Sequence, residues 1–279
     1  MEKFAFILHP LSIADMEHLS PLMKYIPSSV IEAGLKLKHP FKVSHITGLK
    51  SPYAEAEGWF IGCPLTAKQM VELPEEFVMD RIIQSGQVAQ ELGAKIVGLG
   101  AFTSIVGDAG ITVAKNLDIA VTSGNSYTVA TAIQGTKEAA EMMGKNLKEC
   151  RAVVVGATGS IGAASVRLLA KEVKHITLVA RHMGPLEELA QELISKNHCE
   201  VAISQDIHAS LKEADIVITV TSALDFLIEP GDLKPGAVVC DVARPRNVSR
   251  EVSLQRNDVL VIEGGVINVP GNVDFHFNF

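Results

Sequence analysis

A glycine-rich turn between an apolar strand and a helix constrains the fold of this chain more than any other feature. Residues 153–162 read Val-Val-Val-Gly-Ala-Thr-Gly-Ser-Ile-Gly, so a run of valines passes directly into a G-x-x-G-x-x-G turn. In such a turn, Gly156 allows the tight bend, Gly159 lets a diphosphate approach the backbone, and Gly162 lets the helix pack closely. The first turn of the helix adds free N–H groups that attract an anion. The segment therefore predicts a dinucleotide site in an α/β sheet.

We expect the cofactor to contact the whole turn, which consists of Gly156, Ala157, Thr158, Gly159, Ser160, Ile161 and Gly162. The end of the next predicted strand favours NADP(H), because Arg181 and His182 follow the apolar residues 175–180. A carboxylate at this position would bind the ribose 2′-hydroxyl of NAD, whereas a cation suits the 2′-phosphate of NADP. A solvated surface arginine is the alternative interpretation of Arg181.

Two further pairs of residues lie where later strands are predicted to end. Thr221 and Ser222 follow one strand, and Gly264 and Gly265 follow another. Ligands of doubly wound sheets lie against the carboxyl ends of the strands. We therefore expect Thr221 and Ser222 to line the ribose or nicotinamide side, and the glycine pair to let the nicotinamide approach the backbone. Turn residues without a ligand would account for both pairs equally well.

The pattern of apolar runs predicts two α/β domains, and 279 residues exceed a typical single domain of roughly 100–200. Strands are predicted at 4–8, 57–63, 95–99, 118–122, 151–155, 175–180, 215–220, 237–241 and 259–262, and helices at 75–92, 110–116, 126–143, 161–172, 185–195 and 207–213. Prolines 21, 27, 40 and 52 predict only short helices before residue 53.

These elements divide into an N-terminal α/β substrate domain over 1–130, a linking helix over 131–148, and a Rossmann-type doubly wound parallel-sheet NADP-binding domain over 149–279. We expect the active site in a cleft between the two domains. The apolar end, Phe275 to Phe279, predicts that a C-terminal element is missing.

Composition argues against several classes of function. Lys and Arg number 25 against 32 Asp and Glu, a net charge of −7 that leaves no general basic field for nucleic acid. We expect no membrane span, no signal peptide and a cytoplasmic location, because no long apolar run occurs. The four cysteines and nine histidines show no metal-ligand spacing, which predicts no metal. A homo-oligomer is compatible with the sequence, which does not specify an oligomeric state.

From about Leu92 to its end, the chain resembles the long-chain fatty acyl-(acyl carrier protein) reductases, which form aldehydes. The likeness is carried by residues 99–105 (Leu-Gly-Ala-Phe-Thr-Ser-Ile), 122–128 (Thr-Ser-Gly-Asn-Ser-Tyr-Thr), 155–162 and 263–266. It implies NADPH-dependent reduction of an acyl thioester, with a cysteine attacking the thioester carbon. The family's cysteine lies beyond the second glycine block, and none of the four cysteines here matches it. Cys63, at a predicted strand end, is the candidate substitute; a buried core thiol is the alternative.

The chain also resembles, more broadly, the shikimate dehydrogenases, which join an α/β substrate domain to a dinucleotide-binding domain. Residues 124–127 (Gly-Asn-Ser-Tyr) occupy the place of that class's G-x-N-T-D block, and Lys115 corresponds to its catalytic lysine. The resemblance makes Lys115, Asn125 and Tyr127 candidate catalytic residues, although the lysine's partner aspartate is replaced by Tyr127 or lies elsewhere. A solvent-facing helix residue is the alternative interpretation of Lys115. A shikimate- or amino-acid-type NADP dehydrogenase and a non-catalytic NADP-binding sensor therefore stay open beside acyl-thioester reduction.

Two charged stretches remain. No acid occurs between Glu32 and Glu55, a segment that contains Lys36, Lys38, His39, Lys42, His45 and Lys50. It is a candidate docking surface for an acidic acyl carrier protein, with a solvated loop as the alternative. A second polar cluster follows the strand predicted at 237–241 and consists of Asp241, Arg244, Arg246 and Asn247. These residues are candidates for a polar cluster near the site, and surface ion pairing is the simpler explanation.

Overall fold

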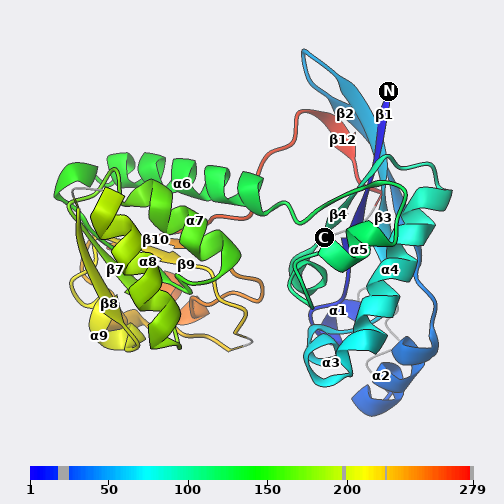
Figure 1. Cartoon of the computed structure of the whole chain (residues 1–279), viewed down its shortest axis with the longest axis horizontal. Helices are drawn as coiled ribbons and strands as arrows, with labels where there is room; N and C mark the ends of the chain where they lie inside the picture. The colour runs from blue at the N-terminus through cyan, green and yellow to red at the C-terminus, as the bar shows by residue number, and fades with distance from the viewer. Residues whose placement is uncertain (18–24, 197–198, 224, 277–279) are drawn as a thin grey trace. The chain divides into compact units, whose positions relative to one another are not determined.

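The computed structural model describes residues 1–17, 25–196, 199–223 and 225–276 (Figure 1). Contacts within the chain divide it into two compact units. Unit 1 consists of Met1–Gly124 together with the residues from Asn268 onward, and unit 2 consists of Asn125–Ile267. Each unit has its own sheet and its own hydrophobic core.

Unit 1 contains a mixed six-stranded sheet in the order β12-β2-β3-β1-β4-β5. The parallel strands are β1 (Glu2–Leu8), β3 (Glu55–Gly62), β4 (Ile96–Leu99) and β5 (Ala120–Thr122). The other two are β2 (Phe41–Lys50), antiparallel to β3, and β12 (Gly271–Asp274), antiparallel to β2. Ile7, Ile61 and Val97 are fully buried within this sheet.

The helices of unit 1 are α1 (Ala14–Glu17), α2 (Ser28–Leu37), α3 (Ala67–Glu72), α4 (Glu75–Glu91) and α5 (Ile111–Lys115). The long helix α4 forms where the sequence predicts it. Pro74 precedes its first turn, which carries Glu75 and Glu76 near the positive end of the helix dipole. Buried Val78 and Ile82 attach it to the core, and Gly93 follows its end with a φ of 88°.

Unit 2 contains a fully parallel six-stranded sheet in the order β11-β10-β9-β6-β7-β8. Its strands are β6 (Arg151–Val155), β7 (His175–Val179), β8 (Glu200–Ser204), β9 (Ile216–Thr219), β10 (Val238–Asp241) and β11 (Leu260–Glu263). This is the order of a dinucleotide-binding sheet, in which the direction of strand addition reverses between the first and fourth strands, here β6 and β9. The predicted α/β class with a doubly wound parallel sheet is confirmed.

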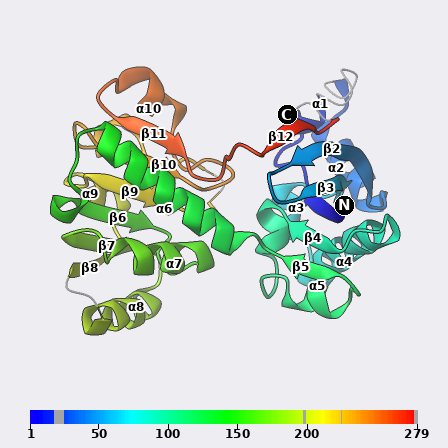
Figure 2. The same ribbon diagram turned by 90° about the horizontal axis from the view of Figure 1, so that it is seen from above.

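Helices cover both faces of this sheet (Figure 2). They are α6 (Asn125–Met142), α7 (Ser160–Leu169), α8 (Met183–Lys196), α9 (Ile207–Leu211) and α10 (Arg250–Gln255). Ala152 and Val154 of β6 are buried in the cluster that contains residues of α6, α7 and α8. The alternate residues, Val153 and Val155, are buried with residues of α9 and α10, as expected for a strand covered on both faces.

The observed boundaries of the two units differ from the predicted ranges 1–130, 131–148 and 149–279. Helix α6 belongs entirely to unit 2 and begins directly after Gly124, whose φ is 72°. Residues from Asn268 return to unit 1, because Gly271 and Asp274 pair with Leu49 and Thr47 of β2. Of the C-terminal aromatics, Phe275 stacks on Phe60, whereas residues 277–279 lie outside the described part of the chain.

Candidate dinucleotide site

The glycine turn lies at the point where the sheet order reverses, and two of its glycines are required by the fold. Gly156 has a φ of 86°, and a Cβ on it would lie 2.6 Å from the carbonyl oxygen of Val220, after β9. A Cβ on Gly162 would lie 2.1 Å from the carbonyl oxygen of Gly156. The N–H groups of Gly156 and Ala157 both donate to the carbonyl of Val179 in β7. The turn is therefore closely packed between β7, β9 and the start of α7.

Gly159 differs from these two glycines because it faces solvent. A Cβ on Gly159 would meet only the carbonyl oxygen of Gly156, at an ordinary contact distance of 3.4 Å. It is the N-cap of α7, where no side chain satisfies the first N–H groups of the helix. The fold does not need a glycine here, but an approaching diphosphate would benefit from the missing side chain and the free N–H groups.

Arg181 and His182 lie beyond the end of β7 with exposed side chains. Only the backbone carbonyl of Arg181 is occupied, by a hydrogen bond from Gln205 Nε2. Within the described residues, neither side chain forms an ion pair or hydrogen bond. The guanidinium is thus available to an anionic ligand at the strand end where a ribose 2′-substituent binds in sheets of this order.

Thr158 faces a shallow groove between α7 and α8, which is also lined by Ala163, Arg167, Pro185, Glu188, Leu189 and Glu192. Arg167 holds the two helices together, since its Nε and Nη2 donate to the two carboxylate oxygens of Glu192 over 2.9 and 2.7 Å. This bidentate bond, with one from Lys196, lowers the pKa of Glu192 to about 2. The groove wall beside Thr158 is therefore held by a charge pair.

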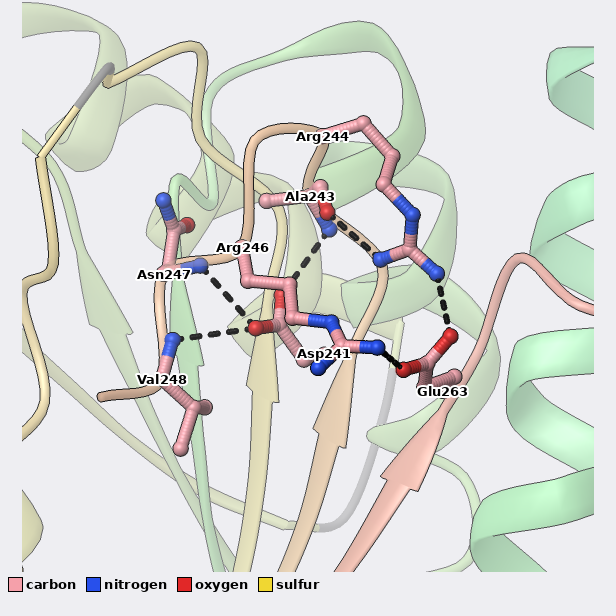
Figure 3. Close-up of polar contacts among 7 residues, drawn as sticks. All are labelled: Asp241, Ala243, Arg244, Arg246, Asn247, Val248 and Glu263. Atoms are coloured by element: carbon pink, nitrogen blue, oxygen red, sulfur yellow. Dashed lines mark hydrogen bonds and ion pairs between the residues drawn. The ribbon is translucent and has the colours of Figure 1, made fainter. Parts of the chain in front are cut away.

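A buried carboxylate organises the loop after β10 (Figure 3). Asp241 is 2% exposed, and its Oδ1 accepts from the N–H of Ala243 over 3.0 Å. Its Oδ2 accepts from the N–H groups of Asn247 and Val248, each over 2.9 Å. Burial raises the pKa of the Asp241 carboxyl, and these hydrogen bonds oppose the rise. Surface ion pairing is the simpler explanation from the sequence, but Asp241 and Asn247 are buried.

Side chains of the same loop also form bonds to the ends of β9 and β11. Asn247 Oδ1 accepts from Thr219 Oγ1 over 2.8 Å, and from the Thr221 N–H and Oγ1 over 3.2 and 2.9 Å. Arg244 Nη2 donates to Glu263 Oε2 over 2.7 Å, and Arg246 donates to Glu263 Oε1. Within the cluster only the two arginines and Glu263 form the expected ion pairs.

The structure places the remaining predicted cofactor residues at the same edge of the sheet, in different surroundings. Thr221 is partly buried against the glycine turn, whereas Ser222 is exposed, and its hydroxyl has no hydrogen bond within the described residues. Gly264 is buried, and a Cβ there would lie 2.5 Å from Cys240 Sγ, so packing explains this glycine. Gly265 is exposed, and a Cβ there would meet only the Val242 carbonyl oxygen, at 3.9 Å. Of the two glycines, Gly265 is therefore the one whose backbone is open to a ligand.

The candidate catalytic residues are divided between the two units. Asn125 begins α6, and its Nδ2 donates to Ser160 Oγ of the glycine turn over 3.1 Å. Tyr127, also in α6, is 63% exposed. Lys115 is exposed at the end of α5 in unit 1, and within the described residues it forms no ion pair. The nearby Asp108 is instead hydrogen-bonded to Thr112.

Cys63 has the surroundings of a core residue rather than of a nucleophile. It lies directly after β3 with no exposed surface, and burial raises the pKa of its thiol to about 12. A nucleophilic cysteine needs its thiolate near neutral pH. Burial also raises the pKa of Cys150, Cys199 and Cys240.

A histidine directly after β1 connects two parts of unit 1. His9 follows β1, and its Nε2 accepts from the N–H of Phe102 over 3.1 Å. Its Nδ1 therefore carries the proton and donates to the carbonyl of Pro10 over 3.1 Å. This contact ties β1 to residues 99–105, where Ala101 adopts a φ of 46°. The His-Pro pair at the end of an apolar run is the only sequence signal for it.

The second half of the chain is similar to a known family. Residues 137–263 match the model of the shikimate / quinate 5-dehydrogenases. This match supports the broad resemblance seen in the sequence. It falls within unit 2, so it concerns the dinucleotide-binding sheet and not unit 1.

Curated relatives are distant. The aminotransferase PigE of a Serratia species is 29% identical over 97% of this chain, but the match covers only 32% of PigE. The long-chain acyl-[acyl-carrier-protein] reductase of Synechococcus elongatus is 29% identical over 70% of this chain and 58% of that protein. The glutamyl-tRNA reductase of Staphylococcus carnosus is 30% identical over 49% of this chain and 31% of that protein. The chain thus spans about a third of the first relative and over half of the second.

Among solved structures, the match to L-tryptophan dehydrogenase from Nostoc punctiforme covers 95% of this chain and 70% of that protein's chain, with 15% identity and a TM-score of 0.47. The match to shikimate 5-dehydrogenase from Listeria monocytogenes covers 95% of this chain and 86% of that protein's chain, with 15% identity and a TM-score of 0.42. The family match and the curated reductases, rather than these structures, support an oxidoreductase.

The described residues contain no helix with the length and apolar character needed to cross a membrane. Nor do the described residues bring three or more His, Cys, Asp or Glu side chains together as a metal site.

Proposed function

We propose that the chain is an NADP(H)-dependent oxidoreductase that reduces an acyl thioester to an aldehyde. The observation that carries the proposal is the pairing of two features in unit 2. An open glycine at residue 159 lies where the strand order reverses. At the end of the neighbouring strand lies Arg181, whose side chain has no ion pair among the residues that the structure describes. This combination suits the diphosphate and the 2′-phosphate of NADPH.

The chain's own residues then have distinct roles. The turn 156–162 would hold the diphosphate, Arg181 and His182 the 2′-phosphate, and Ser222 and Gly265 the nicotinamide side. Bound NADPH supplies a hydride. In the overall reaction the thioester carbon gains that hydride, its bond to sulfur breaks, and the released thiolate takes up a proton. The products are an aldehyde, a free thiol and NADP⁺.

The substrate assignment rests on the likeness to acyl reductases. The proposal names no cysteine as nucleophile, because burial raises the pKa of all four thiols in this chain. Cys63 in particular is too deeply buried for the role that the sequence suggests. Hydride transfer directly to a bound thioester is consistent with the residues present.

A basic surface in unit 1 supports a carrier-bound substrate. Lys36, Lys38 and Lys42 are exposed around the end of α2 and the start of β2, and form no ion pair within the described residues. Lys50 and His45 are instead paired with Glu55 and Glu57. An acidic acyl carrier protein would complement these three exposed lysines, of which Lys38 also lies over the Phe41 ring. Charge reversal at Lys36 and Lys38 should raise the apparent KM for a carrier-bound thioester in a salt-sensitive way, and an unchanged KM would remove this docking surface.

The family match over residues 137–263 favours a second candidate, a shikimate- or amino-acid-type NADP dehydrogenase. A sensor that binds NADP without catalysis is the third. Consumption of NADPH, followed by absorbance, separates them: oxidation with a long-chain acyl thioester supports the proposal, oxidation with 3-dehydroshikimate supports the second candidate, and binding alone supports a sensor.

The cofactor assignment has its own test, by calorimetry with NADPH and NADH. Arg181→Ala should weaken NADPH roughly 10-fold or more and leave NADH nearly unchanged, since a charge-assisted bond to phosphate contributes about 1.5–3 kcal/mol. Arg250→Ala, at an exposed arginine of the same unit, serves as the control. Equal losses for both nucleotides would remove the 2′-phosphate role, and no heat with wild type would remove the cofactor.

A further inference from the structure

We infer that Asn247 is a positioning residue that shapes the nicotinamide side of the site, an inference that rests on the proposed cofactor. Its side-chain Oδ1 binds Thr219 and Thr221, at the end of β9. Its backbone carbonyl accepts from the N–H groups of Leu227 and Ile228, over 2.8 and 3.1 Å. One buried residue therefore holds the chain on both sides of Ser222 and Ala223.

The backbone of Asn247 is itself fixed by Asp241, at the end of β10. Its N–H donates to Asp241 Oδ2 over 2.9 Å, and the adjacent Val248 N–H donates to the same oxygen (Figure 3). Asp241 and Asn247 are 2% and 0% exposed, so neither contact is weakened by water. The end of β10 is thus linked through Asn247 to the end of β9.

The segment that Asn247 holds lies directly against the glycine turn. A Cβ on Gly156 would lie 2.6 Å from the Val220 carbonyl oxygen and 3.1 Å from Thr221 Cγ2. This contact is on the β9 side of β6, whereas Arg181 lies at the end of β7, on the other side. The two halves of a dinucleotide lie on opposite sides of such a reversal point, so Asn247 acts on the half that carries the nicotinamide.

The side-chain amide of Asn247 differs from a carboxylate in charge and in hydrogen bonding. Asn247 Oδ1 receives three hydrogen bonds, while its buried Nδ2 has no partner within the described residues. A carboxylate would accept the same three bonds without leaving a buried donor unsatisfied. It would also place a second negative charge beside Asp241 and near an anionic cofactor. The amide therefore keeps the support of this loop uncharged, at the cost of one unsatisfied group.

The test compares whole dinucleotides with 2′,5′-ADP, which contains the 2′-phosphate but lacks the nicotinamide half. Asn247→Ala should weaken both NADPH and NADH by roughly 10-fold, because it removes three hydrogen bonds to the β9 end. Binding of 2′,5′-ADP should stay within about twofold of wild type, because the glycine turn and Arg181 are unchanged. Arg181→Ala should show the opposite pattern, weakening 2′,5′-ADP and NADPH but not NADH.

A milder variant covers the case in which Asn247→Ala does not fold. Thr221→Val keeps the shape of the side chain but removes one donor to Asn247 Oδ1, so it should show a smaller loss in the same direction. Equal weakening of 2′,5′-ADP and NADPH by these variants would indicate general damage and overturn the inference, as would unchanged binding of both. If wild type binds none of the three nucleotides, the proposed cofactor itself fails, an outcome distinct from either.

Discussion

Asn125 Nδ2 donates to Ser160 Oγ over 3.1 Å, so the first residue of α6 is bound to the first residue of α7. The resemblance to shikimate dehydrogenases makes Asn125 a catalytic candidate, whereas this contact places it against the glycine turn. We predict that Asn125→Ala weakens NADPH about 2- to 10-fold, the loss expected for one hydrogen bond. Fluorescence titration of NADPH measures it. Tyr127→Phe, at an exposed position of the same helix, should change nothing, and an equal loss in both variants would contradict the prediction.

The glycines at 159 and 162 should respond oppositely to a methyl group. Gly159→Ala should fold normally, because its Cβ meets only one atom at 3.4 Å, yet it should weaken NADPH by obstructing the diphosphate. Gly162→Ala should lower the melting temperature strongly, because its Cβ would lie 2.1 Å from a backbone oxygen that cannot move aside. Thermal unfolding and NADPH titration of both variants separate the two effects. A destabilised Gly159→Ala protein with normal affinity would reverse these assignments.

The pair Gly264 and Gly265 permits a similar comparison at the end of β11. Gly264→Ala would place its Cβ 2.5 Å from Cys240 Sγ and 2.7 Å from Val242 Cγ2, and overpacking of this kind costs about 1–3 kcal/mol. Gly265→Ala meets only an oxygen at 3.9 Å and should leave the free energy of unfolding nearly unchanged. Denaturant unfolding measures both. Because the Sγ of Cys240 is the nearest atom, Cys240→Ala should partly restore the stability of Gly264→Ala, and no recovery would exclude this contact as the cause.

The thiols should be unreactive in the folded protein, and Cys63 the least reactive of them. Its pKa of about 12 leaves almost no thiolate near neutral pH, and the side chain has no exposed surface. Brief iodoacetamide treatment, read by mass spectrometry, should modify the partly exposed Cys199 first. In denaturant all four cysteines should react. Preferential labelling of Cys63 in the folded protein would restore it as a nucleophile.

The sequence predicts the parallel sheet of unit 2 and its glycine turn because these depend on local patterns. The valines before Gly156 form a strand buried on both faces, and the turn and helix follow without a gap. Three strands escape the same reasoning, β2, β8 and β12. For β2 and β12 the reason is their pairing with each other. Gly271 pairs with Leu49, which is far away in sequence, and no local pattern shows this contact.

The site itself is predictable only where a residue's role depends on its neighbours along the chain. Gly264 looks like an opening for a ligand in the sequence, but the space beside it is filled by Cys240 and Val242. Likewise, Asn247 follows a strand as an ordinary polar loop residue. Its contact with Thr221 depends on the pairing of β9 with β10, which spacing along the sequence does not contain.

His9 should make the stability of the protein depend on pH. Burial lowers its pKa from the usual 6.5, and both ring nitrogens are satisfied in the neutral form. Below pH 6.5 the unfolded chain takes up a proton at this position while the folded chain does not. The free energy of unfolding therefore decreases as the pH falls from 6.5 toward the lowered folded pKa, and is fully retained above 6.5.

His9→Gln does not titrate, and its side-chain oxygen can still accept from the Phe102 N–H. It should therefore reduce the fall in melting temperature between about pH 7.5 and about pH 5. Part of the fall should remain, because burial also lowers the pKa of His175. His39→Gln, at an exposed position, should keep the full wild-type difference. If His9→Gln and His39→Gln show the same pH dependence, the buried ring is not the group that carries it.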